Sequence, residues 1–188
     1  EAARRRIDGL NAAGLDFEAA LLERVALLRG LPETVIAEVL ESRITPMPGG
    51  ATLVATMRAA GAHAALVSGG FTAFTGAVAA RLGFDEHHAN VLLAEGGHLT
   101  GDVARPILGR EAKVAALAAI TARLGISEAD VIAVGDGAND LGMLGRAGTG
   151  VALHAKPSVA AQCDIRIHHG DLTALLFLQG YARGDFAA

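Results

Sequence analysis

Short apolar segments alternate with helical ones from residue 49 to residue 167, and no other feature of the sequence constrains the fold as strongly. Strands linked through helices of about ten or more residues form right-handed crossovers and a parallel sheet. In such a sheet the ligand binds beyond the carboxyl ends of the strands. A Gly-Gly pair at 96–97 predicts the turn of an inserted β-hairpin. We predict an α/β fold with strands over the apolar runs at 62–67, 89–94, 131–134, 150–153 and 164–167, and helices near 49–60, 71–82, 111–124 and 140–146.

The first part of the chain has a different pattern, because residues 1–43 read as helical throughout. Asp16 is a suitable N-cap for an apolar helix. The segment 45–50, Thr-Pro-Met-Pro-Gly-Gly, then breaks helical structure with two prolines and two glycines. We therefore predict a small helical unit over residues 1–44 and an α/β unit over residues 45–188.

The composition argues against several classes of partner. The 188 residues carry a net charge of −4, so the chain has no general electrostatic attraction for nucleic acid or for an acidic membrane surface. No apolar run reaches the length of about 18–20 residues that crosses a bilayer. The one cysteine, Cys163, excludes an internal disulfide and a cysteine-based zinc site. We interpret it as a small buried side chain and expect a cytoplasmic protein.

The segment 131–140, Val-Ile-Ala-Val-Gly-Asp-Gly-Ala-Asn-Asp, places the oxygens of Asp136, Asn139 and Asp140 at the end of one predicted strand. Carboxylate and amide oxygens suit Mg²⁺, which takes one or two protein carboxylates and completes its shell with water and phosphate oxygens. Turn and N-cap chemistry is the alternative interpretation of the same residues. We favour a Mg²⁺ site because two acids, an amide and two glycines meet at the end of a buried strand.

A second segment, 64–72, ends a predicted strand in Ser68 and two glycines as a helix begins. Free backbone amides and the positive end of a helix dipole attract a phosphate there, with the Ser68 hydroxyl as a further donor. Alternatively, Ser68 only caps the helix.

Lys113 stands in the first turn of another predicted helix, where a cation opposes the dipole unless an anion is close. Either a bound phosphate or solvation with Glu111 nearby accounts for this lysine.

Arg24 falls on the apolar stripe of the predicted N-terminal helix, within about 20° of Phe17 on a helical wheel. An arginine in that position pairs with an internal carboxylate, extends to the rim, or binds the carboxylate of a ligand. The pattern does not choose among these three. The adjacent histidines at 87–88 and 168–169 have no metal-binding spacing, and we interpret them as surface residues.

Together these segments resemble the haloacid dehalogenase superfamily of Mg²⁺-dependent phosphatases, and within it the phosphoserine phosphatases. The second, third and fourth motifs of the family are matched by residues 66–71, by Lys113 and by residues 135–140. The resemblance implies a doubly wound, Rossmann-like parallel sheet with a β-hairpin insertion and a helical cap over residues 1–44. Further similarity lies in the segments 15–28, 43–46, 99–101 and 155–157.

The resemblance also implies a role for each residue that would bind substrate. Ser68 and the Gly69 amide would hold the phosphoryl group, and Lys113 would neutralise its charge. Phe17 and Arg24, from the cap, would contact the serine part of the substrate, with Arg24 binding its carboxylate. The cap would open and close over the site.

The resemblance implies Mg²⁺ as the cofactor, bound by Asp136 and Asp140, with Asn139 completing the site beside the substrate. The implied reaction is the hydrolysis of O-phospho-L-serine to L-serine and phosphate, the last step of serine biosynthesis. The implied partner is this small phosphomonoester, with neither nucleic acid nor a membrane. Monomer and homodimer both stay open.

One motif of the family is missing from the sequence. The first motif, D-x-D-x-T at the end of the first strand, supplies the aspartyl nucleophile and a general acid/base, and no Asp-x-Asp occurs in residues 1–188. In the family that strand is central and lies between the strands that here end at Ser68 and at Gly135. We therefore expect the nucleophile in a segment that precedes Glu1. We also expect residues 1–188 alone to fold poorly and to leave phosphoserine intact.

Two other functions stay open at this point. A non-catalytic homologue would keep the phosphate pocket and bind a phospho-ligand or another protein. A serine hydrolase would use Ser68 as the nucleophile with Asp136 and His154 in hydrolase order, although Leu66 stands where a nucleophile elbow requires glycine.

Overall fold

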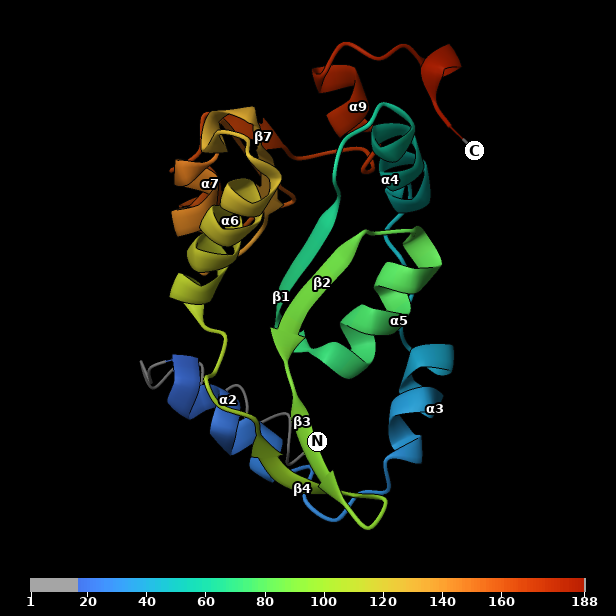
Figure 1. Ribbon diagram of the computed structural model, residues 1–188, viewed down its shortest axis with the longest axis vertical. Coiled ribbons are helices and arrows are strands. Elements are labelled where there is room, and N and C mark those ends of the chain that lie inside the picture. The colour runs from blue at the N-terminus through green and yellow to red at the C-terminus, as the bar shows by residue number, and fades with distance from the viewer. Residues whose placement is uncertain (1–16, 188) are drawn as a thin grey trace.

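Figure 1 shows the computed structural model of the protein, which describes residues 17–187. Helices and strands alternate after the first three helices, as the sequence predicts. The helices are α2 (Phe17–Ala26), α3 (Thr34–Ser42), α4 (Gly50–Ala59), α5 (Thr72–Leu82), α6 (Arg110–Leu124), α7 (Leu141–Arg146), α8 (Pro157–Ala160) and α9 (Ala174–Leu178). The strands are β1 (Ala65–Phe71), β2 (Glu86–Asn90), β3 (Leu92–Glu95), β4 (His98–Val103), β5 (Ile132–Gly135), β6 (Thr149–Leu153) and β7 (Ile165–Ile167). Turns of 3-10 helix cover Glu128–Asp130 and Arg183–Asp185.

The parallel strands predicted near 62–67, 131–134, 150–153 and 164–167 are confirmed, and they belong to two sheets. The strand predicted over 89–94 is wrong, because β2 ends at Asn90 and the chain after Val91 enters the antiparallel hairpin strand β3. β1 pairs in parallel with β2, while β5, β6 and β7 form a second parallel sheet in that order. β1 and β5 therefore each have one edge that is unpaired within residues 17–187. The family resemblance predicts one further strand at this place, between β1 and β5.

The predicted hairpin is formed by β3 and β4, which pair in antiparallel fashion. Its turn contains Gly96 and Gly97, with φ values of +58° and +77°. Positive φ at both central residues is the geometry of a two-residue hairpin turn, and glycine adopts it without steric cost. The Gly-Gly pair thus identified the turn correctly.

The predicted helical unit is represented by α2 and α3, whereas its predicted N-cap, Asp16, lies outside the described residues. α2 buries Leu21 and Val25, and both pack with Val103 of β4. Figure 1 shows α2 alongside β4 at the same end of the molecule. The first described helix therefore packs on the hairpin, which the sequence alone places in the second unit.

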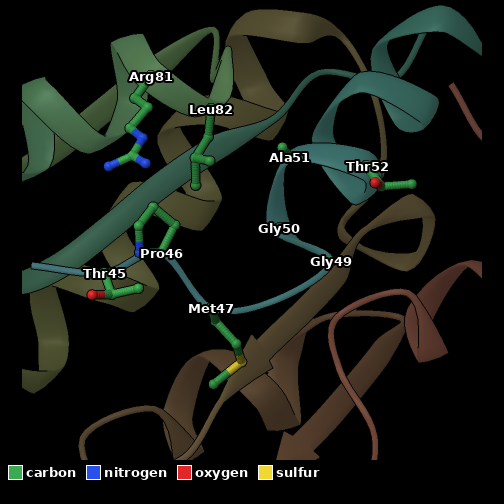
Figure 2. Close-up of a pocket in the computed structure, with 9 residues that line it drawn as sticks. All are labelled: Thr45, Pro46, Met47, Gly49, Gly50, Ala51, Thr52, Arg81 and Leu82. Atoms are coloured by element: carbon green, nitrogen blue, oxygen red, sulfur yellow. The ribbon is translucent and has the colours of Figure 1, made fainter. Parts of the chain in front are cut away.

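The predicted hinge between the two units is held against the C-terminal part of the chain. Gly49 has a φ of +78°, and a Cβ there would lie 2.8 Å from the backbone nitrogen of Thr173 and 2.9 Å from Asp171 Oδ1. The carbonyl of Pro48 accepts a hydrogen bond from the Leu172 amide at 3.1 Å. A cavity of about 300 Å³ lies beside this hinge, between the start of α4 and the end of α5. Figure 2 shows the residues that line it.

A hydrophobic cluster supports the second sheet. Ala133 of β5 and Ala152 of β6 pack with Leu144 of α7 and with Cys163. Cys163 is 7% exposed, which confirms that it is a buried side chain. In the described part of the chain, no helix has the length and hydropathy of a membrane span.

Candidate active site

The loop that follows β5, residues 136–140, is called the acidic loop here, and Asp140 makes its main contacts. Asp140 is 3% exposed, and its Oδ2 atom accepts hydrogen bonds from the backbone amides of Asp136 at 3.1 Å and Gly137 at 2.9 Å. Its Oδ1 atom accepts a hydrogen bond from Nζ of Lys113 in an ion pair. Charge-assisted hydrogen bonds to both oxygens offset the desolvation of a buried carboxylate. Asp140 therefore holds the loop backbone and the lysine in one arrangement.

Lys113 lies in the first turn of α6, and its side chain is only 12% exposed. A solvated surface lysine balanced by Glu111 is therefore the wrong interpretation of this residue. The anion that offsets its unfavourable position near the positive end of the helix dipole is the Asp140 carboxylate. The structure thus brings the predicted phosphate-neutralising cation to the predicted metal-binding loop.

The two glycines on either side of Asp136 are required by close approach of side chains. A Cβ at Gly135 would lie 2.5 Å from Cβ of Asp140, and a Cβ at Gly137 would lie 2.3 Å from Oδ1 of Asn139. These distances are far below van der Waals contact, so any larger residue would displace the acid or the amide. The amide oxygen of Asn139 therefore folds back over the loop.

The chemistry of this loop fits a Mg²⁺ ion. Asp136 is exposed just after the end of β5, and its backbone amide donates to Asp140 in the same loop. In residues 17–187 no group of three or more His, Cys, Asp or Glu side chains could hold a metal ion. Mg²⁺ needs only one or two protein carboxylates, because water and phosphate oxygens complete its shell. Asp136 and the Asn139 amide oxygen can supply such ligands, whereas Asp140 would have to share its oxygens with Lys113 and the two backbone amides.

Residues 68–70, called the serine loop here, form a bulge within β1 and do not follow the end of that strand. The sequence predicts that the strand stops at Val67, but β1 continues to Phe71, and its register with β2 shifts between these residues. Within the bulge, the Gly70 amide donates a hydrogen bond to Ser68 Oγ at 3.0 Å. The N-cap of α5 is Phe71, so the interpretation of Ser68 as a helix cap is wrong. Because Ser68 Oγ accepts this bond, its hydroxyl hydrogen can donate to a ligand.

Phe17, at the start of α2, lies over the serine loop. A Cβ at Gly69 would be 3.1 Å from Cζ of Phe17 and 4.0 Å from Nδ2 of Asn139. A Cβ at Gly109, just before α6, would be 3.4 Å from the Phe17 ring. The structure therefore brings together Phe17, Gly69 and Asn139, which the family resemblance assigns to the substrate-binding site.

Arg24 is half-buried on α2, and its Nε atom donates a hydrogen bond to the carbonyl of Ala20 at 3.0 Å. This bond lies within the helix. It does not decide between an internal carboxylate, the rim and a ligand carboxylate as the partner of the guanidinium.

The prediction that the histidines at 87–88 are surface residues is wrong for His87, which contacts α5, whereas the side chain of His88 is 40% exposed. Both are half-buried. His87 Nδ1 lies 3.0 Å from Oγ1 of Thr75, and His88 Nε2 lies 2.9 Å from Oε2 of Glu86. The second histidine pair is exposed, as predicted.

Sequence analysis missed Asn90, the last residue of β2. It is 2% exposed, and its side chain bonds both to Gly69 in the serine loop and to Leu108 before α6. The available signal was a polar amide within the apolar run at 89–94, because a buried polar side chain requires hydrogen-bond partners.

Comparison with known proteins gives the class to which this site belongs. A family model described as haloacid dehalogenase-like hydrolase matches residues 2–145. The chain belongs to the haloacid dehalogenase-like hydrolase family. This confirms the resemblance and the α/β fold that it implies.

Relatives within the family are phosphoserine phosphatases. The phosphoserine phosphatase of Albidiferax ferrireducens is 46% identical over 167 residues, covering 87% of this chain and 70% of that protein. The phosphoserine phosphatase SerB2 of Mycobacterium tuberculosis is 42% identical over 174 residues, covering 93% of this chain. The chain spans only 42% of the length of SerB2.

A solved structure of a substrate-bound phosphoserine phosphatase superposes with a TM-score of 0.85 at 36% identity, covering 92% of this chain and 84% of that one. A structure described as a phospho-aspartyl intermediate analogue of phosphoserine phosphatase also gives a TM-score of 0.85, at 35% identity, covering 93% and 85% of the two chains.

Proposed function

We propose that the full-length gene product is a Mg²⁺-dependent phosphatase that converts O-phospho-L-serine and water to L-serine and phosphate. The observation that carries the proposal is the buried ion pair between Lys113 and Asp140, which joins a cation on α6 to the carboxylate loop after β5. Phosphoryl transfer depends on positioning and charge neutralisation more than on any other contribution. The relatives named phosphoserine phosphatases support the choice of substrate.

The proposed roles follow the geometry of the serine loop. The Ser68 hydroxyl and the Gly69 amide donate to phosphoryl oxygens, and Lys113 neutralises their charge. Phe17 lies over Gly69 and is suited to cover the phosphoserine once it is bound. Arg24, from the same helix, is the proposed partner of the substrate carboxylate, since a guanidinium can bind a carboxylate through two hydrogen bonds.

Asp136 and Asp140 are the proposed ligands of Mg²⁺, with Asn139 beside them at the substrate. When bound, Mg²⁺ supplies positive charge at the phosphoryl oxygens. The contribution of the chain is to hold the loop rigid, which Asp140 does through the backbone amides of Asp136 and Gly137.

We place the nucleophile outside residues 1–188, because no Asp-x-Asp occurs in them. A strand between β1 and β5 would pair their open edges and end beside the serine and acidic loops. There an aspartate oxygen would bond to phosphorus as the bond from phosphorus to the serine oxygen breaks, and the serine oxygen would take a proton from the second aspartate of the same motif, which would then accept a proton from the attacking water. Water would then release phosphate from the aspartate. The relative described as a phospho-aspartyl intermediate analogue supports this route.

The test is phosphate release from O-phospho-L-serine by the full-length gene product, with Mg²⁺ and after treatment with EDTA. We expect turnover that EDTA abolishes and Mg²⁺ restores, and none from residues 1–188 alone. Turnover that survives EDTA but is lost to a serine-directed fluorophosphonate would identify a serine hydrolase that uses Ser68. Binding of orthophosphate without turnover of any phosphomonoester would identify a non-catalytic binder.

The cytoplasmic location stays a prediction, and the oligomeric state, monomer or homodimer, stays open. Cell fractionation tests the first, and light scattering of the purified full-length protein tests the second.

A further inference from the structure

The side-chain amide of Asn90 is buried at the point where three segments meet. Its Oδ1 atom accepts a hydrogen bond from the Leu108 amide at 2.7 Å. Its Nδ2 group donates to the Gly69 carbonyl at 3.0 Å and to the Leu108 carbonyl at 3.4 Å. Asn90 thus pairs with both backbone groups of Leu108 and still reaches the serine loop. Every polar atom of this buried side chain is satisfied, as burial requires.

The bond to Gly69 leads through one peptide group to the Ser68 hydroxyl. The peptide that contains the Gly69 carbonyl also contains the Gly70 amide, and that amide donates to Ser68 Oγ at 3.0 Å. Fixing the carbonyl fixes the plane of this peptide, because the peptide bond is planar. The position of Asn90 Nδ2 therefore determines the direction from which Ser68 Oγ receives its hydrogen bond, and so the direction left for its own hydrogen.

The bonds to Leu108 lead to the lysine. Leu108 precedes Gly109, the N-cap of α6, and Lys113 lies in the first turn of that helix. Lys113 continues the connection to Asp140, whose other oxygen binds backbone amides of the acidic loop. Side-chain hydrogen bonds thus connect the serine loop, the start of α6 and the acidic loop, although β1 and β5 lie in separate sheets.

We propose that Asn90 is a positioning residue, which sets the Ser68 hydroxyl and the first turn of α6 at the separation that a phosphoryl group requires. Asn90 contacts neither substrate nor metal in this role, and acts through the backbone of Gly69 and Leu108. The inference rests on the proposed function, since it assigns Ser68 and Lys113 to the same phosphoryl group.

Asparagine is the side chain that this position requires. Aspartate keeps the acceptor for the Leu108 amide but, when ionised, turns a second negative oxygen toward the carbonyls of Gly69 and Leu108. Protonated aspartate regains one donor for these carbonyls. Two carbonyls facing the carboxyl disfavour its ionised form, so this proton returns at a pH above the ordinary range of aspartate.

The first experiment compares Asn90→Asp with the wild type in the full-length gene product, on whichever phosphomonoester the wild type hydrolyses best. We expect kcat/KM to fall about 100-fold at neutral pH, the loss typical of a small displacement of reacting groups. The ratio of variant to wild-type kcat/KM should rise as the pH is lowered, because the protonated carboxyl regains a donor. A ratio that stays constant with pH would overturn the proposal.

The second experiment asks whether Asn90 acts through Ser68. Asn90→Asp is measured in the wild type and in Ser68→Ala, and we expect its effect on kcat/KM to shrink when the hydroxyl is absent. Equal fold-losses in both backgrounds, within about twofold, would mean independent roles and would overturn the proposal.

Thr56→Val is the matched control for lost stability. Thr56 is 2% exposed and accepts a hydrogen bond from the Ala187 amide at 2.8 Å, on a different part of the chain. We expect this variant to lower Tm and to leave kcat/KM within about twofold of the wild type. If Thr56→Val and Asn90→Asp lower kcat/KM alike at equal loss of Tm, Asn90 has only a structural role.

The same assays separate this inference from the proposed function. A wild type that hydrolyses another phosphomonoester and leaves phosphoserine intact contradicts the proposed substrate, while the two Asn90 experiments still decide the positioning role. A wild type that hydrolyses no phosphomonoester contradicts both.

Discussion

Nζ of Lys113 donates to Oδ1 of Asp140, and this ion pair joins the first turn of α6 to the loop after β5. The two side chains are 12% and 5% exposed. Each charge therefore helps to offset the desolvation cost of the other. Asp140 has two further donors in the backbone of its loop, whereas the pair as a whole depends on how α6 packs beside β5.

Removing one partner of this pair is expected to destabilise the fold. Lys113→Met leaves a buried carboxylate without its cation, which costs on the order of 3 kcal/mol in unfolding free energy. The double variant with Asp140→Asn should recover part of this loss, because no charge is then left unpaired. Urea denaturation of the four proteins in the cycle measures the coupling. Strictly additive losses would show that the two charges do not interact.

A different substitution of the same lysine tests catalysis separately from stability. Lys113→Ala is expected to lower kcat by about 100-fold or more, since a group that stabilises transition-state charge is lost. The measurement is steady-state turnover of phosphoserine by the full-length gene product at a temperature where the variant is folded. Near-native turnover would contradict the role given to this lysine.

Asp136→Asn is expected to weaken Mg²⁺ binding and to lower kcat by about 100-fold or more. Asp136 is exposed beyond β5, so the change removes charge without leaving a buried group unpaired, and Tm should barely move. Turnover measured at increasing Mg²⁺ concentrations gives both the apparent affinity for Mg²⁺ and kcat. Asp164 is an exposed aspartate just before β7, and Asp164→Asn is the control. This variant should match the wild type in Mg²⁺ affinity and in kcat. An unchanged Mg²⁺ requirement in Asp136→Asn would exclude it as a ligand.

Gly135→Ala is expected to disrupt the acidic loop. Its Cβ would lie 2.5 Å from both Cβ and Cγ of Asp140, so the side chain that pairs with Lys113 must shift. We expect a loss of both Tm and kcat. Gly145→Ala in α7 is the matched control, because nothing lies within 4 Å of the added Cβ. In a helix this change stabilises by about 0.5–1 kcal/mol. Comparable behaviour of the two variants by thermal melting and assay would refute the close-approach argument.

Asp85 makes part of the stability depend on pH. The Ala64 amide donates to its Oδ2 atom at 2.8 Å and is the main reason that the pKa of this carboxyl lies below its usual value. Burial acts in the opposite direction, and the Arg58 guanidinium at 2.9 Å reinforces the lowering of the pKa. A lowered folded-state pKa stabilises the fold above the unfolded value of about 3.9 and stops doing so as the pH falls through the folded value.

Asp85→Asn should therefore be less stable than the wild type at neutral pH, with a difference that shrinks as the pH falls below about 4. Denaturation midpoints measured across that range give the difference directly. A difference for Asp85→Asn that does not change with pH would rule out this contribution.

The sequence was sufficient for most elements and for the choice of family. Helix α6 spans Arg110–Leu124 where 111–124 was predicted, and the Gly-Gly turn of the hairpin was found correctly. These features are local, since helical periodicity, glycine at positive φ and a strand followed by oxygen-bearing side chains are all set by near neighbours in the chain.

Only the tertiary structure decided what the key side chains touch. The bulge that holds Ser68, the pairing of Lys113 with Asp140 and the bonds from Asn90 to Gly69 and Leu108 all depend on strand register and helix packing. The residue types alone are equally compatible with Ser68 as a helix cap, Lys113 as a solvated lysine and Asn90 as an ordinary core residue. Contacts between segments many residues apart are fixed by the joint burial of apolar surface and the satisfaction of buried polar groups, and no single stretch of sequence contains that information.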